Sequence, residues 1–145
     1  MEIKEIIKRW KGNQRYTLKL VEAMPEANFD FKPTPEVKSF LSQCSHVTTW
    51  LRTHSRFVTE SEMEKQKFKT KTEIKSGLDD FFNQFLEFLK NTTEENLEQK
   101  VKVFYGNVSK AFIIKTMDNH LSHHRGQMIL YLRLKNVKPP SYIGW

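Results

Sequence analysis

The sequence predicts an all-α fold, specifically a four-helix bundle. Four long segments carry apolar side chains at intervals of three and four residues, which is the period of an amphipathic α-helix. Five glycines and five prolines among 145 residues are too few for the many tight turns of a β-sandwich or barrel. Eleven phenylalanines and three tryptophans supply large apolar surfaces for a core. We therefore expect residues 1–145 to form one domain in which the four helices bury their apolar stripes against one another.

The first helix is predicted from Ile3 to Met24, where a proline follows. Residues 25–38 hold three prolines, each of which biases the preceding residue away from the helical conformation. We expect this segment to be a connection that Phe29 and Phe31 hold in place.

Ser39 is a good N-cap for a second helix over residues 40–58, which carries apolar or aromatic side chains on both faces. Residues 59–71 alternate acidic and basic side chains and contain few apolar ones. That composition is typical of a solvated loop.

Thr70 and Glu73 have the spacing of a capping box, which predicts a third helix from this point to about Asn91. Its apolar stripe is the strongest in the sequence. We expect Thr92 and Glu95 to cap one short turn after it.

The last part of the chain is predicted to hold a short extended segment and a long helix. Residues 101–105 alternate apolar and polar side chains until the Gly-Asn pair at 106–107 breaks the pattern. Ser109 is the expected N-cap of a final helix that reaches about Lys135. Asn136 can then adopt the left-handed conformation that ends a helix.

The formal net charge is +7, and it is unevenly distributed. Residues 1–100 carry 17 basic and 16 acidic side chains, whereas residues 101–145 carry seven basic ones and a single acidic one, a net +6. Such a segment favours an anionic partner. The single cysteine, Cys44, excludes disulfide frameworks and Cys-rich zinc modules. The N-terminus has charges in every turn, unlike a signal peptide or a membrane span, and we expect a cytoplasmic protein.

The histidines are the chemical signal in the sequence, because all five lie in the second and fourth predicted helices. They are His46, His54, His120, His123 and His124. Positions 120 and 124 are about one helical turn apart, so both imidazoles project from one face within reach of a single metal ion. Their stripe is apolar, so the two polar rings are expected to point into the bundle and need partners there.

Two alternatives stand beside a metal site. Buried histidines are most often satisfied by ordinary hydrogen bonds, although two at ligand spacing weaken that interpretation. His123 also shares a face with His120, but its stripe is more polar, which favours a place at the surface or behind the ligands. The third ligand would come from the second helix, which offers His46 and His54.

Three histidine ligands would leave a coordination position open, which is the arrangement of a catalytic metal centre. Position 121 is leucine, so the HExxH motif is absent, and the glutamate pattern of di-iron bundles is absent as well. Three imidazoles suit zinc, nickel and iron, and copper too, so the identity of a divalent ion cannot be predicted.

Two segments resemble the DinB/YfiT-like superfamily. Residues 119–145 (NHLSHHRGQMILYLRLKNVKPPSYIGW) are similar to its C-terminal signature, in which a His-x-x-x-His pair precedes Arg-Gly-Gln and a Tyr-Leu-Arg stretch. Residues 32–47 (KPTPEVKSFLSQCSHV) resemble the entry to its second helix.

The resemblance implies a DinB-like four-helix bundle, commonly a homodimer, with a divalent metal ion bound by His46, His120 and His124. It thereby selects His46 over His54. It also implies a metal-dependent enzyme, a transferase or hydrolase that activates a thiol or water on a small molecule, like the bacillithiol and mycothiol S-transferases. A metal-binding dimer without activity is an alternative.

Several neighbours of these histidines have two interpretations. Gln127 follows His124 by one turn and is a candidate hydrogen-bonding partner behind the ligands, while Trp50 is either a pocket wall or ordinary packing. Gly126 inside a helix suggests close approach of another backbone. Cys44 is expected to be a small buried apolar residue, and Tyr131 either reaches substrate or fills the core.

The second functional hypothesis is a small basic bundle that binds nucleic acid non-specifically. No sequence-specific recognition motif accompanies the basic residues, and no membrane partner is expected. The cations that would contact phosphate are Lys102, Lys110, Lys115, Arg125, Arg133, Lys135 and Lys138.

Overall fold

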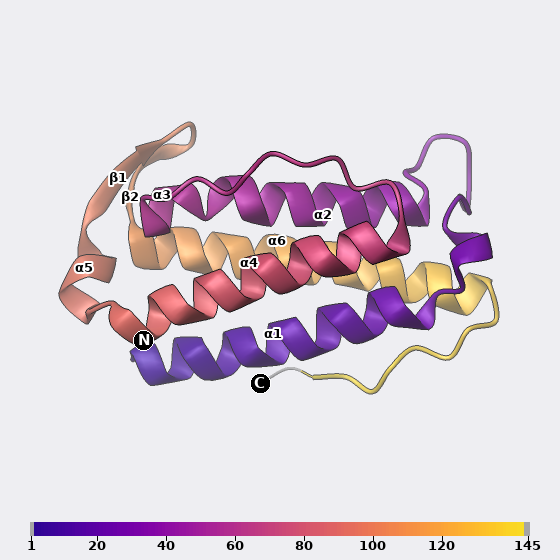
Figure 1. Cartoon of the computed structure of the whole chain (residues 1–145), viewed down its shortest axis with the longest axis horizontal. Helices are drawn as coiled ribbons and strands as arrows, with labels where there is room; N and C mark the ends of the chain where they lie inside the picture. Colours follow the sequence, from indigo (N-terminus) through magenta and orange to yellow (C-terminus); the bar gives the residue numbers. More distant parts are fainter. Residues whose placement is uncertain (1, 144–145) are drawn as a thin grey trace.

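Four long helices dominate the computed structural model, which describes residues 2–143 (Figure 1). They are α1 (Ile3–Ala23), α2 (Phe40–His54), α4 (Lys71–Asn91) and α6 (Lys110–Leu134). Both α1 and α2 pack against α4 and α6, which closes a bundle. The predicted all-α four-helix bundle is confirmed.

The direction of the helices follows from a long connection. Figure 1 shows that residues 60–70 run back along α2, so that α4 begins at the same end as α2 and both run the same way. Helices α1 and α6 run in the opposite direction. As a result α2 and α6, which carry all five histidines, are antiparallel neighbours.

The helix starts follow the capping residues of the sequence. Ser39 accepts a hydrogen bond from the N–H of Ser42 at the start of α2, and Ser109 does the same for Phe112 at the start of α6. Thr70 forms the complete predicted capping box of α4. Asn136, with φ of 58°, has the left-handed conformation expected after α6.

The connection from α1 to α2 is held as expected. It contains the short 3₁₀ helix η1 (Glu26–Asn28), after which the buried ring of Phe29 packs edge-on against Phe40 at 5.1 Å. The N–H of Leu41 donates to the carbonyl of Phe29, and that of Phe40 to the carbonyl of Phe31. These contacts fix the angle at which α2 enters the bundle.

Three details differ from the predictions. The helix expected over residues 40–58 is interrupted at Ser55, whose hydroxyl donates to the Arg52 carbonyl, and a separate turn α3 (Arg56–Thr59) follows. The short helix α5 (Glu94–Glu98) is capped by Thr93 and not by Thr92. The residues after it form a hairpin of β1 (Lys100–Val103) and β2 (Gly106–Ser109), where only one extended segment was expected.

A cluster of large aromatic rings forms the core between α1 and α4. The Trp10 ring, 1% exposed, meets Phe85 at 4.8 Å and Phe81 at 6.0 Å, both in edge-on contacts. Edge-on pairs of this kind bury large apolar areas and add favourable ring–ring contacts. This aromatic cluster lies on the side of the bundle opposite the α2–α6 pair.

Candidate metal centre

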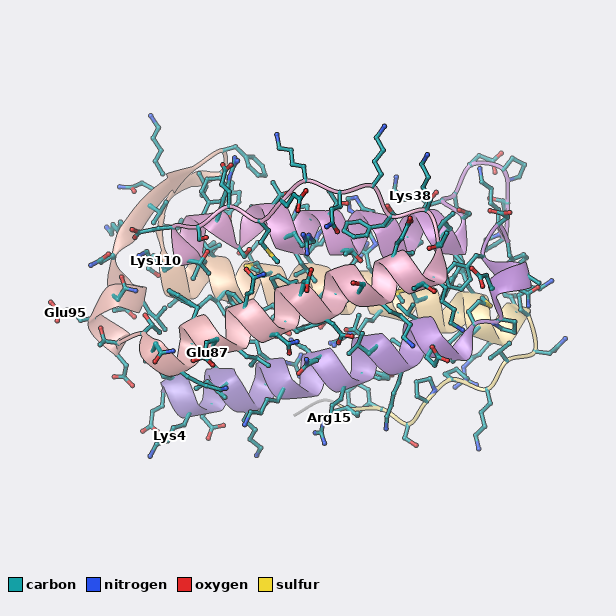
Figure 2. The ribbon with its side chains drawn as sticks, viewed as in Figure 1. Lys4, Arg15, Lys38, Glu87, Glu95 and Lys110 are labelled. Atoms are coloured by element: carbon teal, nitrogen blue, oxygen red, sulfur yellow. The ribbon has the colours of Figure 1, made fainter. Side chains whose placement is uncertain are left out.

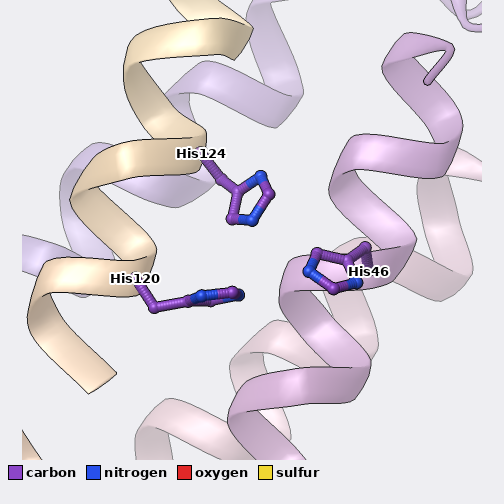
Figure 3. Close-up of side chains that lie close together, drawn as sticks. All are labelled: His46, His120 and His124. Carbon is purple, nitrogen blue, oxygen red and sulfur yellow. The ribbon is translucent and has the colours of Figure 1, made fainter. Parts of the chain in front are cut away.

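His46 on α2 faces His120 and His124 on α6 in the space between the two helices (Figure 3), where His124 is buried and the other two are half-buried. The ring of His46 lies 5.3 Å from that of His120 and 4.7 Å from that of His124, and the two rings on α6 are 4.5 Å apart. One ring nitrogen from each residue lies within 4.8 Å of the other two. These three residues could hold one metal ion.

A second observation, independent of the spacing of the rings, also indicates that these residues suit a metal ion. The Nε2 atom of His120 is buried and has no hydrogen-bond partner among residues 2–143. A buried polar atom without a partner costs about 1–3 kcal/mol, and a coordinated cation would remove that cost. The arrangement is therefore better suited to an ion than to a set of mutually satisfied histidines.

Gln43 fixes the orientation of one imidazole. Its Oε1 lies 2.8 Å from the Nδ1 of His124, and both residues are buried. Because an amide oxygen only accepts, Nδ1–H is the donor, and the lone pair of His124 is left on Nε2. A partner of this kind behind a ligand holds its tautomer and raises its basicity.

Sequence reasoning missed Gln43. It precedes His46 by three residues, so it lies almost one turn earlier on the same side of α2. A hydrogen-bonding side chain three residues before a candidate ligand was therefore the pattern from which Gln43 could have been found. The expected partner, Gln127, lies near both histidines: its Nε2 is 3.1 Å from the Nε2 of the exposed His123, and a hydrogen bond of its side chain opposes the lowering of the His124 pKa.

Burial keeps the three imidazoles neutral. Desolvation, followed by the repulsion of the neighbouring histidines, lowers the pKa of His120 and of His124 to about 4. The pKa of His46 is lowered by burial and by the positive charge of Lys38. All three therefore have unprotonated nitrogens near pH 7, as a metal ligand requires.

The other two histidines lie outside the cluster. His54 is buried on α2, and its Nε2 is 2.9 Å from the hydroxyl of Tyr105 in the hairpin. The indole of Trp50 lies flat between the rings of His54 and His120, at 4.2 and 3.9 Å. Trp50 is thus a wall against a candidate ligand. His123 is exposed on the outer face of α6.

Two other residues near the histidines have structural roles, and the expectation for a third is wrong. Cys44 is buried in the core as predicted, and burial raises the pKa of its thiol. The Tyr131 hydroxyl donates to the Lys38 carbonyl at 2.7 Å. The close backbone approach expected at Gly126 is wrong, because a Cβ added there would meet no described atom within 4 Å.

The nucleic-acid hypothesis loses two of its seven cations. Lys110, near the hairpin end of the bundle in Figure 2, is 2% exposed and donates to Glu60 at 2.6 Å and Asn96 at 2.9 Å. Arg125 is 4% exposed and donates to Asn13. Phosphate cannot reach either side chain, because both are buried and donate hydrogen bonds within the fold.

A further structural finding concerns membranes. Within residues 2–143, no helix combines the length and the apolar character needed to cross a bilayer.

Comparison with solved structures shows the same fold. A DinB-like protein from Bacillus cereus matches with a TM-score of 0.86 at 18% identity, over 96% of each chain. A DinB-like protein from Bacillus subtilis matches with a TM-score of 0.81 at 17% identity, over 97% of this chain and 99% of that one. At such identities the likeness concerns the fold alone.

Sequence comparison identifies the family. No curated protein matches the chain. The sequence pattern of the DinB family, in contrast, matches residues 1–143. The chain therefore belongs to the DinB family.

Proposed function

We propose that this protein binds a divalent metal ion through His46, His120 and His124, and that the ion activates a thiol or a water molecule for transfer or hydrolysis on a small molecule. The observation that carries the proposal is the convergence of three imidazoles whose ligand atoms lie within 4.8 Å of one another. The buried Nε2 of His120, which lacks a partner among the described residues, supports it.

The donor set favours a catalytic centre over a structural one. Structural zinc sites are usually closed by four protein ligands, whereas three leave at least one position open. Histidine ligands are neutral, so a bound ion keeps its full positive charge, with which it acidifies a bound thiol or water and polarises an oxygen atom of the substrate. Zinc, nickel and iron all suit three imidazoles.

A low-molecular-weight thiol of the bacillithiol or mycothiol type is the proposed co-substrate. Lys38 is close enough to His46 to lower its pKa, so a positive charge lies beside the centre. The net +6 of residues 101–145 adds to the positive field around α6. Such a field favours the approach of a thiolate or a carboxylate.

A cytoplasmic homodimer completes the proposal. Leu130 and Leu134 lie on successive turns of α6, and each is about half exposed. Exposed apolar side chains in this arrangement suit a contact with a second copy. Light scattering of the purified protein measures its mass directly, and a monomer at micromolar concentration would contradict this part of the proposal.

Metal analysis tests the proposal. Purified protein should contain about one divalent ion per chain, and a His120→Ala/His124→Ala double variant should contain none. The double variant should keep the circular dichroism of the wild type, which separates loss of ligands from loss of fold. Stoichiometric metal in the folded double variant would overturn the proposed site.

A thiol-transfer screen tests the reaction. Metal-loaded wild type and the double variant would be compared with low-molecular-weight thiols and a panel of electrophilic small molecules. The proposal expects turnover by the wild type alone. Equal rates for both proteins would show that the centre does not activate the thiol.

A further inference from the structure

A row of four aromatic rings joins the candidate metal centre to the hairpin. His120 stacks on Trp50 with ring centroids 3.9 Å apart and planes inclined by 19°. Trp50 stacks on His54 at 4.2 Å and 13°, and His54 lies at 19° to the ring of Tyr105, 5.8 Å away. The row therefore crosses from α6 to α2 and ends in the turn between β1 and β2.

The two candidate ligands on α6 are held in different ways. His124 is oriented by a hydrogen bond from its Nδ1 to Gln43. For His120, the buried Nε2 has no hydrogen-bond partner within residues 2–143, and the ring that stacks on the flat face of its imidazole is that of Trp50. The orientation of the His120 imidazole thus depends on how firmly the indole itself is held.

Tyr105 fixes the far end of the row. Its hydroxyl is 2.9 Å from the Nε2 of His54. Burial raises the pKa of Tyr105 and lowers that of His54, so a protonated phenol donates to a neutral imidazole. This bond opposes rotation of the His54 ring about its χ2 angle, so the indole stacks on an imidazole that is itself held in place.

The hairpin places Tyr105 in a tight turn that is joined directly to α6. Val103 pairs with Gly106, so Phe104 and Tyr105 alone form the turn. Gly106 has φ of 144°, a conformation that side-chain-bearing residues rarely adopt. Ser109, at the end of β2, is also the N-cap of α6, so the hairpin is attached directly to the helix of the candidate ligands.

From this geometry we propose that Tyr105 and His54 are positioning residues of the metal centre, which act through Trp50 to hold the His120 imidazole in its ligand orientation. The inference rests on the proposed function, because it concerns the same three-histidine site. It gives the β1–β2 hairpin, which contributes no ligand, a defined effect on metal affinity and on coordination geometry.

Titration with Co²⁺ tests the inference, because the visible absorption of the bound ion reports its ligand geometry. Trp50→Leu removes the stack and should weaken Co²⁺ binding by about 10- to 100-fold, the usual effect of losing a partner behind a ligand. Tyr105→Phe removes only one hydroxyl, and we expect about threefold or greater weakening together with a changed Co²⁺ spectrum. Tyr142→Phe is the matched control, since the same atom is removed from an exposed tyrosine that packs on Tyr16 of α1.

The outcomes separate the positioning role of Tyr105 from the proposed metal site itself. A wild-type affinity and an unchanged spectrum in Tyr105→Phe would overturn the positioning role while leaving the proposed metal site intact. A wild type that binds no Co²⁺ would overturn both. If Trp50→Leu fails to fold, Tyr105→Phe and its control carry the test alone.

Discussion

The two sides of the bundle use the same kind of helix pairing for opposite purposes. Between α1 and α4 the inward positions hold large apolar rings, with Trp10 in contact with Phe81 and Phe85. Between α2 and α6 the facing positions hold imidazoles, among them the half-buried His46 and the buried His124. The first side stabilises the fold by burying apolar surface. The second side buries less apolar surface, because polar ligand atoms occupy part of it.

This difference teaches where stability and function reside in a chain of 145 residues. A substitution on the α1–α4 side should change the free energy of unfolding and leave the metal affinity of folded molecules unchanged. A substitution of a side chain that contacts the three histidines should change the metal affinity and have a smaller effect on the free energy of unfolding. The following experiments are ordered by the size of the effect that this division predicts.

The largest effect is expected for Phe81→Ala on the α1–α4 side. Phe81 is fully buried and contacts both Trp10 and Phe85. Truncation of a phenylalanine in such a core costs about 3–5 kcal/mol, which urea unfolding measures. Folded Phe81→Ala should still bind one ion per chain, and a parallel loss of metal from folded molecules would break the division.

A smaller effect, on metal binding alone, is expected for Gln43→Leu. The substitution removes the acceptor for Nδ1 of His124 with little change in volume. The affinity for the ion should fall about 10- to 100-fold, as measured by competition with a chelator. Gln14→Leu is the matched control, because Gln14 donates to Asn83 between α1 and α4 and not to a histidine. A larger loss in Gln127→Leu than in Gln43→Leu would restore the role that the sequence suggested for Gln127.

The stability of the metal-free protein should depend on pH because of His120 and His124. Their pKa is lowered to about 4 at both His120 and His124, from an ordinary value of 6.5. Between these values the unfolded chain binds more protons than the folded one, so the free energy of unfolding should fall as pH decreases through this window. Above pH 6.5 this contribution should be constant.

Urea titrations across this range provide the measurement for the pH effect. A variant with both His120 and His124 replaced by phenylalanine should show a flatter profile than the wild type. Identical slopes for the two proteins between pH 4 and 6.5 would contradict the burial of neutral imidazoles.

The smallest effect is expected on the outer face of α6. A Cβ at Gly126 meets no described atom within 4 Å, and the residue is in the middle of a helix. Gly126→Ala should therefore stabilise the protein by about 0.5–1 kcal/mol without changing metal affinity. Gly126 lies one turn before Leu130 on the same stripe, so measurement on the monomeric protein separates this effect from the proposed dimer contact. A destabilised monomer would contradict the open space at Gly126.

The helices could be predicted from the sequence because local patterns determine them. Apolar periodicity and the caps at Ser39, Thr70 and Ser109 located three helix starts. The strand β2 could not be predicted, because Val108 is its single large apolar residue and its extended conformation depends on pairing with β1. The cap of α5 was assigned one residue early, since Thr92 and Thr93 are equally suited by sequence.

The candidate site was predictable only where its parts share one helix. The spacing of His120 and His124 fixes a common face, but the choice between His46 and His54 rested on the family resemblance. The contacts of Tyr105 depend on how the hairpin folds onto α2, which no local pattern encodes. The prediction of a close backbone contact at Gly126 was wrong, because a glycine in the sequence does not show whether another segment packs against it.

The metal content of His124→Ala and His123→Ala tests the central claim most directly. The two residues are adjacent on α6, yet His124 faces His46 and His123 is exposed. Under saturating Zn²⁺ followed by dialysis, we expect about one ion per chain in His123→Ala and a loss of that ion in His124→Ala. Equal metal content in the two folded variants would contradict a centre built from His46, His120 and His124.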